Sequence, residues 1–226
     1  MSERIRVKAK GLLFDMDGVL ISSIGSVVRS WRIWAKQYGV PDADSYMVPH
    51  GMRAIDIVKS LRPDIDPLEG LKVIEDLEIV DTSDLKVLPG ARELLESLPP
   101  EQWAIVTSAT RRLMLGRLKA AGLPAPERII SADDVERGKP DPEPYRRGAE
   151  LLGSRPEECI VVEDAPSGVG AGRAAGSRVL GVIGTHTLEE LHAADWVVNS
   201  LEEVRVSSEA DGLEVEFTPV KIPAVR

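Results

Sequence analysis

The sequence predicts an α/β protein whose core is a parallel sheet with helices on both faces and a small helical unit inserted into it. Short apolar runs bounded by turn residues alternate with amphipathic stretches, which is typical of parallel strands joined by crossover helices. The first two clear runs, Gly11–Phe14 and Trp103–Val106, are separated by roughly ninety residues. A single crossover helix needs far fewer residues, so an inserted unit is expected between these runs.

Five apolar runs are the clear candidate strands of the core: Gly11–Phe14, Trp103–Val106, Cys159–Val162, Val179–Ile183 and Trp196–Val198. A further short strand is expected at Arg128–Ser131. Near the end of the chain, Val204–Val220 alternates apolar and polar residues around Ala210-Asp211-Gly212, which predicts a terminal hairpin at about 204–220. The core is expected to comprise residues 1–21 and 89–226.

The inserted unit is expected to span residues 22–88, where apolar residues recur at helical spacing and no convincing strand pattern is present. Trp31 and Trp34 lie on one face of its first helical stretch, so we expect them in the interior of this unit. Hinges are expected near Leu20–Ser23 and Val87–Gly90. These features predict a small α-helical cap.

Composition and charge exclude several classes of protein. With 226 residues and 43% hydrophobic content the chain can bury a core, and its net charge of −9 does not attract nucleic acid or an anionic membrane. Met1–Lys10 lacks the apolar stretch of a signal peptide, and no apolar run of about 18 residues could cross a bilayer. The only cysteine, Cys159, excludes an internal disulfide and is expected to be buried. We expect a cytoplasmic protein with no nucleic-acid or membrane partner.

Two carboxylates, Asp15 and Asp17, follow the first strand, at the sheet edge where open parallel sheets bind ligands. Because the two acids repel one another, a bound magnesium ion would stabilise them and leave an oxygen of Asp15 free to attack phosphorus. Asp17 could protonate the leaving oxygen and later activate water, and Gly18 permits the tight backbone that follows. Aspartates are also common in turns, so this pair alone is weak evidence.

Hydroxyl and amide groups follow the second strand, just before a helix that begins near Arg111. Such groups at a helix start can bind phosphate, although they are equally typical of an ordinary helix N-cap. The residues expected to bind phosphate in this way are Thr107, Ser108 and Ala109.

A lysine and a second acidic pair complete the set. Lys139, in a turn with Pro140, could offset the charge on a transferring phosphoryl group, although most lysines in turns are merely solvated. Asp164 follows the Cys159–Val162 strand and suits a metal ligand, with Glu163 as an outer or alternate ligand. The four clusters in this order predict one phosphoryl-transfer site.

This order of residues resembles the haloacid dehalogenase superfamily of phosphohydrolases over nearly the whole chain. Its four motifs match, in order, Asp15-x-Asp17, Thr107-Ser108, Lys139 and Glu163-Asp164. The resemblance implies a Rossmann-like three-layer core with a helical cap, an aspartyl-phosphate on Asp15, and Mg²⁺ held by Asp15, Asp164 and the backbone carbonyl of Asp17. Further segments, such as Glu163-Asp164-Ala165-Pro166-Ser167-Gly168, are most similar to glycerol-phosphatases, 2-deoxyglucose-6-phosphate phosphatases and bacterial sugar phosphatases. The implied substrate is a small sugar or polyol phosphate.

Residues of the insert bear on the substrate. The resemblance implies that the loop with His50 and Arg53 reaches over the site and touches the substrate. Ser22 stands where many relatives have an aspartate, which the glycerol-phosphatase group tolerates. Val27 stands where the β-phosphoglucomutase branch has a histidine, so the mutase is the less favoured alternative.

Two other functional classes are weighed. The segment Gly170-Ala171-Gly172-Arg173-Ala174-Ala175 mimics the glycine fingerprint of dinucleotide-binding oxidoreductases, but it begins too late after its strand and follows two acids. A noncatalytic protein on the same fold is disfavoured by the intact set of acids and lysine. His186 and His192 lack acidic or cysteine partners at metal-ligand spacing and are expected to be incidental. We therefore expect an Mg²⁺-dependent phosphatase that acts on a small-molecule phosphate ester, with a monomer favoured.

Overall fold

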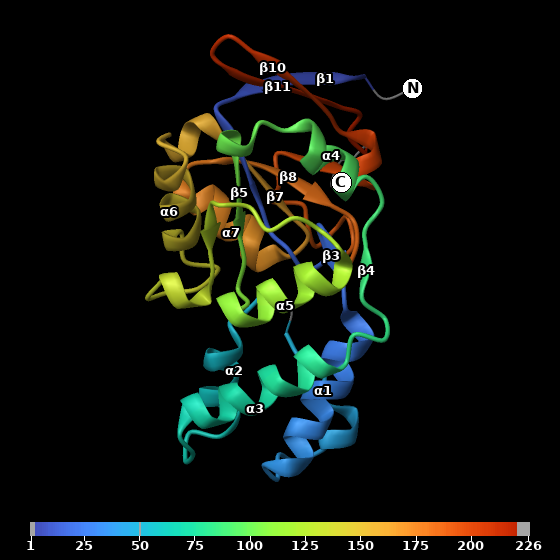
Figure 1. The fold of residues 1–226 in the computed structure, drawn as a ribbon, viewed down its shortest axis with the longest axis vertical. Helices are drawn as coiled ribbons and strands as arrows, with labels where there is room; N and C mark the ends of the chain where they lie inside the picture. The colour runs from blue at the N-terminus through green and yellow to red at the C-terminus, as the bar shows by residue number, and fades with distance from the viewer. Residues whose placement is uncertain (1–2, 50, 221–226) are drawn as a thin grey trace.

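A six-stranded parallel sheet forms the centre of the protein, in the computed structural model that describes residues 3–49 and 51–220. The strand order is β6-β5-β2-β7-β8-β9, and each neighbouring pair is parallel (Figure 1). The strands are β2 (Gly11–Phe14), β5 (Trp103–Val106), β6 (Ile129–Ile130), β7 (Cys159–Glu163), β8 (Arg178–Val182) and β9 (Trp196–Val198). The predicted fold class and core strands are confirmed, with β6 two residues long and β8 starting one residue earlier than expected.

Four helices cover the sheet on its two faces: α4 (Ala91–Ser97), α5 (Arg111–Ala121), α6 (Glu143–Leu151) and α7 (Pro166–Ala175). Because successive side chains of a strand point to opposite faces, Leu12 and Phe14 join the apolar cluster of α4 and α5, while Leu13 joins that of α6 and α7. The cysteine on β7, Cys159, is buried in this second cluster as expected. The result is the three-layer core that the sequence predicts.

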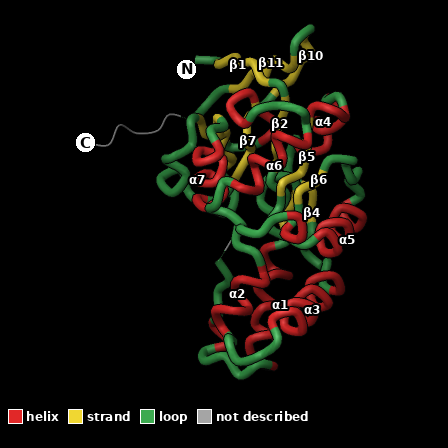
Figure 2. Tube along the Cα trace, turned by 90° about the vertical axis from the view of Figure 1, so that its left-hand side faces the viewer, coloured by secondary structure: helices red, strands yellow, loops and turns green. Residues whose placement is uncertain are grey.

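Among its described residues, the inserted unit has three α-helices, α1 (Ile24–Gln37), α2 (Ala54–Leu61) and α3 (Pro67–Val80), with an apolar interior of its own (Figures 1 and 2). Trp31 and Trp34 are both buried in that interior, as expected.

The chain enters and leaves this unit through two short strands, β3 (Ile21–Ser22) and β4 (Lys86–Val87), which pair antiparallel with each other. The expectation of no strand within 22–88 was therefore wrong at its edges, because a two-residue ladder is too short to produce a sequence pattern. The ribbon lies where the hinges are expected. We propose residues 22–88 as the cap on this basis.

A separate three-stranded antiparallel sheet lies at the end of the core away from the cap (Figure 1). Its strands are β1 (Ile5–Ala9), β10 (Arg205–Glu209) and β11 (Gly212–Phe217). The predicted hairpin is present as β10 and β11, but β1 was not predicted. Its partner β11 lies at the other end of the sequence, so no local turn signal announces the pairing.

Short 3₁₀ helices occupy several connections: Ala43–Ser45, Pro100–Gln102, Ala132–Asp134, Pro156–Glu158 and Leu201–Glu203. Across residues 3–49 and 51–220, none of the helices has the length and apolar character needed to cross a bilayer.

Candidate active site

The carboxyl ends of three adjacent strands bring the predicted site residues together at one edge of the sheet. Asp15 follows β2, Thr107 follows β5, and Glu163 ends β7; in the sheet, β2 lies between β5 and β7. Parallel strands present their carboxyl ends on the same side, so these side chains converge. Lys139 reaches the same point from the loop before α6.

The ammonium group of Lys139 is buried among three oxygen atoms. Its Nζ donates hydrogen bonds to Asp15 Oδ1 at 2.6 Å, Glu163 Oε1 at 2.7 Å and the Val106 carbonyl oxygen at 2.9 Å. Burial by itself would lower the pKa of Lys139, but the carboxylates of Asp15 and Glu163 outweigh it and raise that pKa. A permanent positive charge is therefore held beside the oxygen of Asp15.

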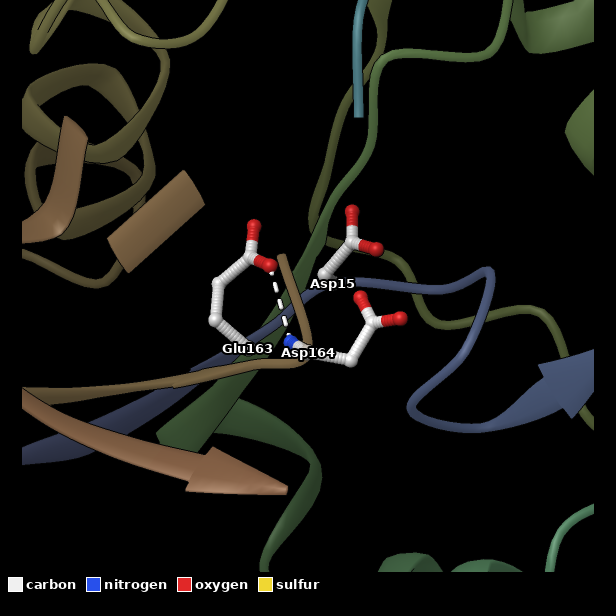
Figure 3. A group of neighbouring side chains, drawn as sticks. All are labelled: Asp15, Glu163 and Asp164. Atoms are coloured by element: carbon white, nitrogen blue, oxygen red, sulfur yellow. Dashed lines mark hydrogen bonds between the residues drawn. The ribbon is translucent and has the colours of Figure 1, made fainter. Parts of the chain in front are cut away.

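Glu163 has partners on both carboxylate oxygens. Its Oε1 also accepts a hydrogen bond from the Tyr145 hydroxyl at 2.7 Å, and its Oε2 accepts from the backbone N–H groups of Asp164 and Ala165 at 3.0 and 3.2 Å. Figure 3 shows Glu163 turned back toward the backbone of Asp164, while the carboxylates of Asp15 and Asp164 lie beside each other. This geometry favours a role for Glu163 in orienting Lys139. It is less suited to a role for Glu163 as a direct metal ligand.

The cluster of acids fits a hard divalent cation. Carboxylate oxygens of Asp15, Glu163 and Asp164 lie within 4.8 Å of one another, and all three residues are buried. Burial, opposed by Lys139, raises the pKa of Asp15 to about 7. Burial and the neighbouring carboxylates of Glu163 and Asp15 raise the pKa of Asp164 well above its usual range. A cation bound by oxygen ligands would relieve this crowding of negative charge.

Gly18 allows Asp164 to approach this cluster. Its φ is +87°, in the left-handed region, and a Cβ at this position would lie 1.9 Å from Asp164 Oδ2. Asp164 Oδ2 also accepts a hydrogen bond from the Thr185 hydroxyl, and His186 Nδ1 lies 3.1 Å from the Asp164 carbonyl oxygen. His186, expected to be incidental, contacts a predicted metal ligand because chain folding brings it to a residue 22 positions earlier. Thr185 was missed for the same reason.

Asp17 is held by hydrogen bonds from Ser23 and Arg117, two residues far apart in the chain. Its Oδ1 accepts a hydrogen bond from Ser23 Oγ at 3.2 Å, and its Oδ2 accepts from Arg117 Nη1 at 2.7 Å. The other end of the same guanidinium, Nη2, donates to Glu78 Oε2 at 2.9 Å. Arg117 comes from α5 and Glu78 from the cap helix α3. Neither residue has a local signal in the sequence, because both resemble ordinary charged residues of a helix.

The segment expected to bind phosphate lies just before the start of α5 and makes contacts both within itself and with the cap. The Ala109 N–H donates to Thr107 Oγ1 at 3.1 Å, and Ser108 Oγ donates to the carbonyl oxygen of Gly51 in the cap at 2.8 Å. Thr110 accepts a hydrogen bond from the Leu113 N–H, so it is also an ordinary N-cap of α5. Thr107, Ser108 and Ala109 all line the cavity between core and cap.

That cavity has a volume of about 110 Å³ and joins the acids of the core to the cap. Its cap side is largely apolar and includes Val27, Trp31 and Ile57, with Glu78 as a polar exception. Arg53 is not among its lining residues. Its guanidinium instead donates to Asp56 at 2.7 Å and to the Val135 carbonyl oxygen at 3.1 Å, which joins α2 to the loop before Lys139. His50 lies outside the described residues.

The fold and this site define a haloacid dehalogenase-like hydrolase, and the chain belongs to that family: its model matches residues 9–176. Hexitol phosphatase A of Escherichia coli is 39% identical over 91% of this chain and 98% of its own. Glycerol-1-phosphate phosphohydrolase 2 of Saccharomyces cerevisiae is 35% identical over 94% of this chain and 91% of its own. Among solved structures, a hydrolase from Pseudomonas syringae aligns with a TM-score of 0.74 and 29% identity, over 84% of this chain and 93% of its own.

The rival dinucleotide fingerprint does not form a nucleotide-binding turn. Gly170 and Gly172 lie inside helix α7 and not in the loop after β7. A Cβ at Gly172 would lie 2.9 Å from Val179 and 3.1 Å from Val161, so this glycine lets the helix pack closely on the sheet.

Proposed function

We propose that the protein is a phosphatase that hydrolyses a small sugar or polyol phosphate through an aspartyl-phosphate on Asp15. The observation that carries this proposal is the contact of Lys139 with Asp15 Oδ1 at 2.6 Å, beside the acidic cluster. A carboxylate paired with a buried cation at the edge of the cavity is poised to receive a phosphoryl group. The family and the two phosphatase relatives support the same reaction.

In the first step, an oxygen of Asp15 forms a bond to phosphorus while the ester P–O bond breaks, and Asp17 gives its proton to the leaving alkoxide. In the second step, Asp17 takes a proton from water as the water oxygen attacks phosphorus. The bond from phosphorus to Asp15 then breaks and releases inorganic phosphate. Lys139 offsets the negative charge of the phosphoryl oxygens in both steps.

We propose Mg²⁺ as the metal, held by Asp15, Asp164 and the backbone carbonyl of Asp17, with Glu163 as an outer ligand. When bound, it would shield the phosphoryl oxygens from the carboxylates that surround them. Buried oxygen ligands at this density suit a hard cation of this kind.

Thr107, Ser108 and Ala109 are proposed to bind the phosphoryl oxygens, because all three line the cavity next to Asp15. Arg53 and His50 remain proposed contacts of the substrate, and the Arg53 guanidinium also joins the cap to the loop before Lys139. We propose a cytoplasmic monomer acting on a small-molecule ester, since the net charge of −9 does not favour nucleic-acid or membrane partners.

The alternative of a β-phosphoglucomutase-type mutase is less favoured. Val27 lines the cavity where that branch has a histidine, and an apolar side chain cannot accept or donate a proton there. Asp17 is then free to activate water once the alcohol has left.

A phosphate-release screen over C2 to C6 sugar and polyol phosphates, with and without Mg²⁺, tests the proposal. We expect release that needs the metal and stops with a chelator. β-Glucose 1-phosphate, followed by phosphorus NMR, should yield inorganic phosphate faster than glucose 6-phosphate. The reverse order would assign the mutase reaction, and no release from any ester would reject phosphatase activity.

A further inference from the structure

A buried arginine connects the proposed acid/base residue to the cap. The Arg117 guanidinium donates to Asp17 Oδ2 at 2.7 Å through Nη1 and to Glu78 Oε2 at 2.9 Å through Nη2. Arg117 belongs to the core helix α5 and Glu78 to the cap helix α3, and both line the cavity with Asp17. The bridge therefore spans the boundary between the two parts of the molecule at the site itself.

The exposure of the three side chains indicates what this bridge does. The side chains of Arg117 and Glu78 are each 6% exposed, whereas that of Asp17 is 34% exposed. Neighbouring atoms therefore enclose the arginine, whereas the aspartate is partly open to solvent and is oriented by its hydrogen bonds to Arg117 and Ser23. Charge-assisted hydrogen bonds of this length are strong and directional, so Arg117 can select one orientation of the Asp17 carboxylate.

Electrostatics keeps the arginine in place. Burial would lower the pKa of Arg117, but the carboxylates of Asp17 and Glu78 raise it further than burial lowers it. If one of these carboxylates were lost, the positive charge of the buried guanidinium would be balanced by a single negative charge. Glu78 therefore holds the end of Arg117 that Asp17 does not reach.

Orientation of an acid/base group affects the rate directly. Such a group must lie within hydrogen-bond reach of the oxygen that it protonates, and small misplacements reduce the rate steeply. We propose that Arg117 is a positioning residue for Asp17, and that Glu78 makes this positioning depend on the cap being docked on the core. The inference rests on the proposed function, because it assumes that Asp17 transfers protons during phosphate-ester cleavage.

Two substrates separate positioning from a purely structural role. A polyol phosphate has a poor leaving group that needs a proton, whereas p-nitrophenyl phosphate releases a stable anion without one. We measure cleavage of each ester in single turnovers with enzyme in excess. Arg117→Met should lower the rate for the polyol phosphate about 100-fold, while the rate for p-nitrophenyl phosphate stays within about threefold of wild type. Glu78→Gln should give a smaller loss with the same selectivity.

A matched control comes from the same pair of helices. Arg112 of α5 contacts Asp76 of α3 at 2.5 Å and Glu75 at 3.3 Å, but no contact joins it to Asp17 among the described residues. Arg112→Met therefore weakens cap docking without removing the contact to Asp17, and it should change the two rates by the same factor. If Arg117→Met fails to fold, the double variant Arg117→Met/Glu78→Gln removes both buried charges and takes its place.

The outcomes are distinct. Equal losses for the two esters in Arg117→Met, or the same selectivity in Arg112→Met, would overturn the positioning role while phosphatase activity stands. A wild-type protein that cleaves neither ester would instead reject the proposed function, and the inference with it.

Discussion

Glu163 Oε1 lies 2.7 Å from Lys139 Nζ, and both side chains are only 1% exposed. Glu163 is thus held by a lysine that also contacts Asp15. This buried ion pair therefore orients the ammonium group that contacts the proposed nucleophile. Removing one partner of a buried ion pair leaves the other charge uncompensated, whereas exposed pairs contribute little.

Lys139→Met should therefore lower the free energy of unfolding by about 3 kcal/mol and abolish phosphate release. Urea denaturation at neutral pH measures the first effect. Lys72→Met is the matched control, because Lys72 pairs with Asp76 at 2.6 Å but is 71% exposed, and it should leave the unfolding midpoint almost unchanged. Equal midpoints for the two variants would contradict a structural role for the buried pair.

Asp15→Asn should abolish turnover and leave the fold intact, because the change keeps the volume and removes the nucleophilic anion. The covalent intermediate can be sought directly in Asp17→Asn, which lacks the base for the second step. With p-nitrophenyl phosphate, this variant should accumulate a phosphorylated protein that intact-mass spectrometry detects. The double variant Asp15→Asn/Asp17→Asn should not, and phosphorylation of that double variant would place the nucleophile elsewhere.

Gly18→Ala should weaken metal binding about tenfold or more, because the new Cβ would lie 1.9 Å from Asp164 Oδ2 and push this ligand away. Gly153→Ala is the control for backbone strain. Gly153 also has a left-handed φ, +65°, but a Cβ there has nothing within 4 Å. Titrating Mg²⁺ into each protein by calorimetry compares them, and similar affinities would show that Asp164 does not depend on Gly18.

Glu78 should give the protein a characteristic pH dependence of stability. Burial, opposed by Arg117, raises its pKa from 4.5 to about 7. Between these two values the folded state binds more protons than the unfolded state, so the stability contributed by Glu78 falls as the pH rises through this window. Glu78→Gln removes this titration, so its stability should fall less than that of wild type as the pH rises from 5 to 8. Urea unfolding at both values tests this, and a constant difference between the two proteins would reject the shifted pKa.

The sequence predicts those parts of the fold and site that have a local cause. Strand β2 and Asp15 are adjacent in the chain. An apolar run followed directly by an acid therefore predicts both the strand and the position of the Asp15 side chain at its carboxyl end. The same holds for β7 with Glu163. Once these strands are parallel neighbours, the convergence of their ends follows from geometry.

Residues that meet through tertiary packing could not be predicted in this way. Arg117 contacts Asp17 across 100 positions of sequence, and Tyr145 of helix α6 donates a hydrogen bond to Glu163 at the end of strand β7. Arg53 is a further case: its substrate contact stays a prediction, while its ion pair with Asp56, three residues later, was not predicted. The choice between such partners depends on side-chain directions that a linear pattern does not contain.

The β3 and β4 ribbon has a consequence for how such an enzyme diversifies. Because Ile21 pairs with Val87 and Ser22 with Lys86, the chain leaves and re-enters the core at one place. The segment between them can be exchanged for that of a relative by two cuts only a strand's width apart, without disturbing the sheet that carries Asp15. Under the proposed function, the cap segment, which selects the alcohol of the substrate, can then change in evolution while the core keeps the residues that transfer the phosphoryl group. A transplanted segment would, however, still need an acid to meet Arg117.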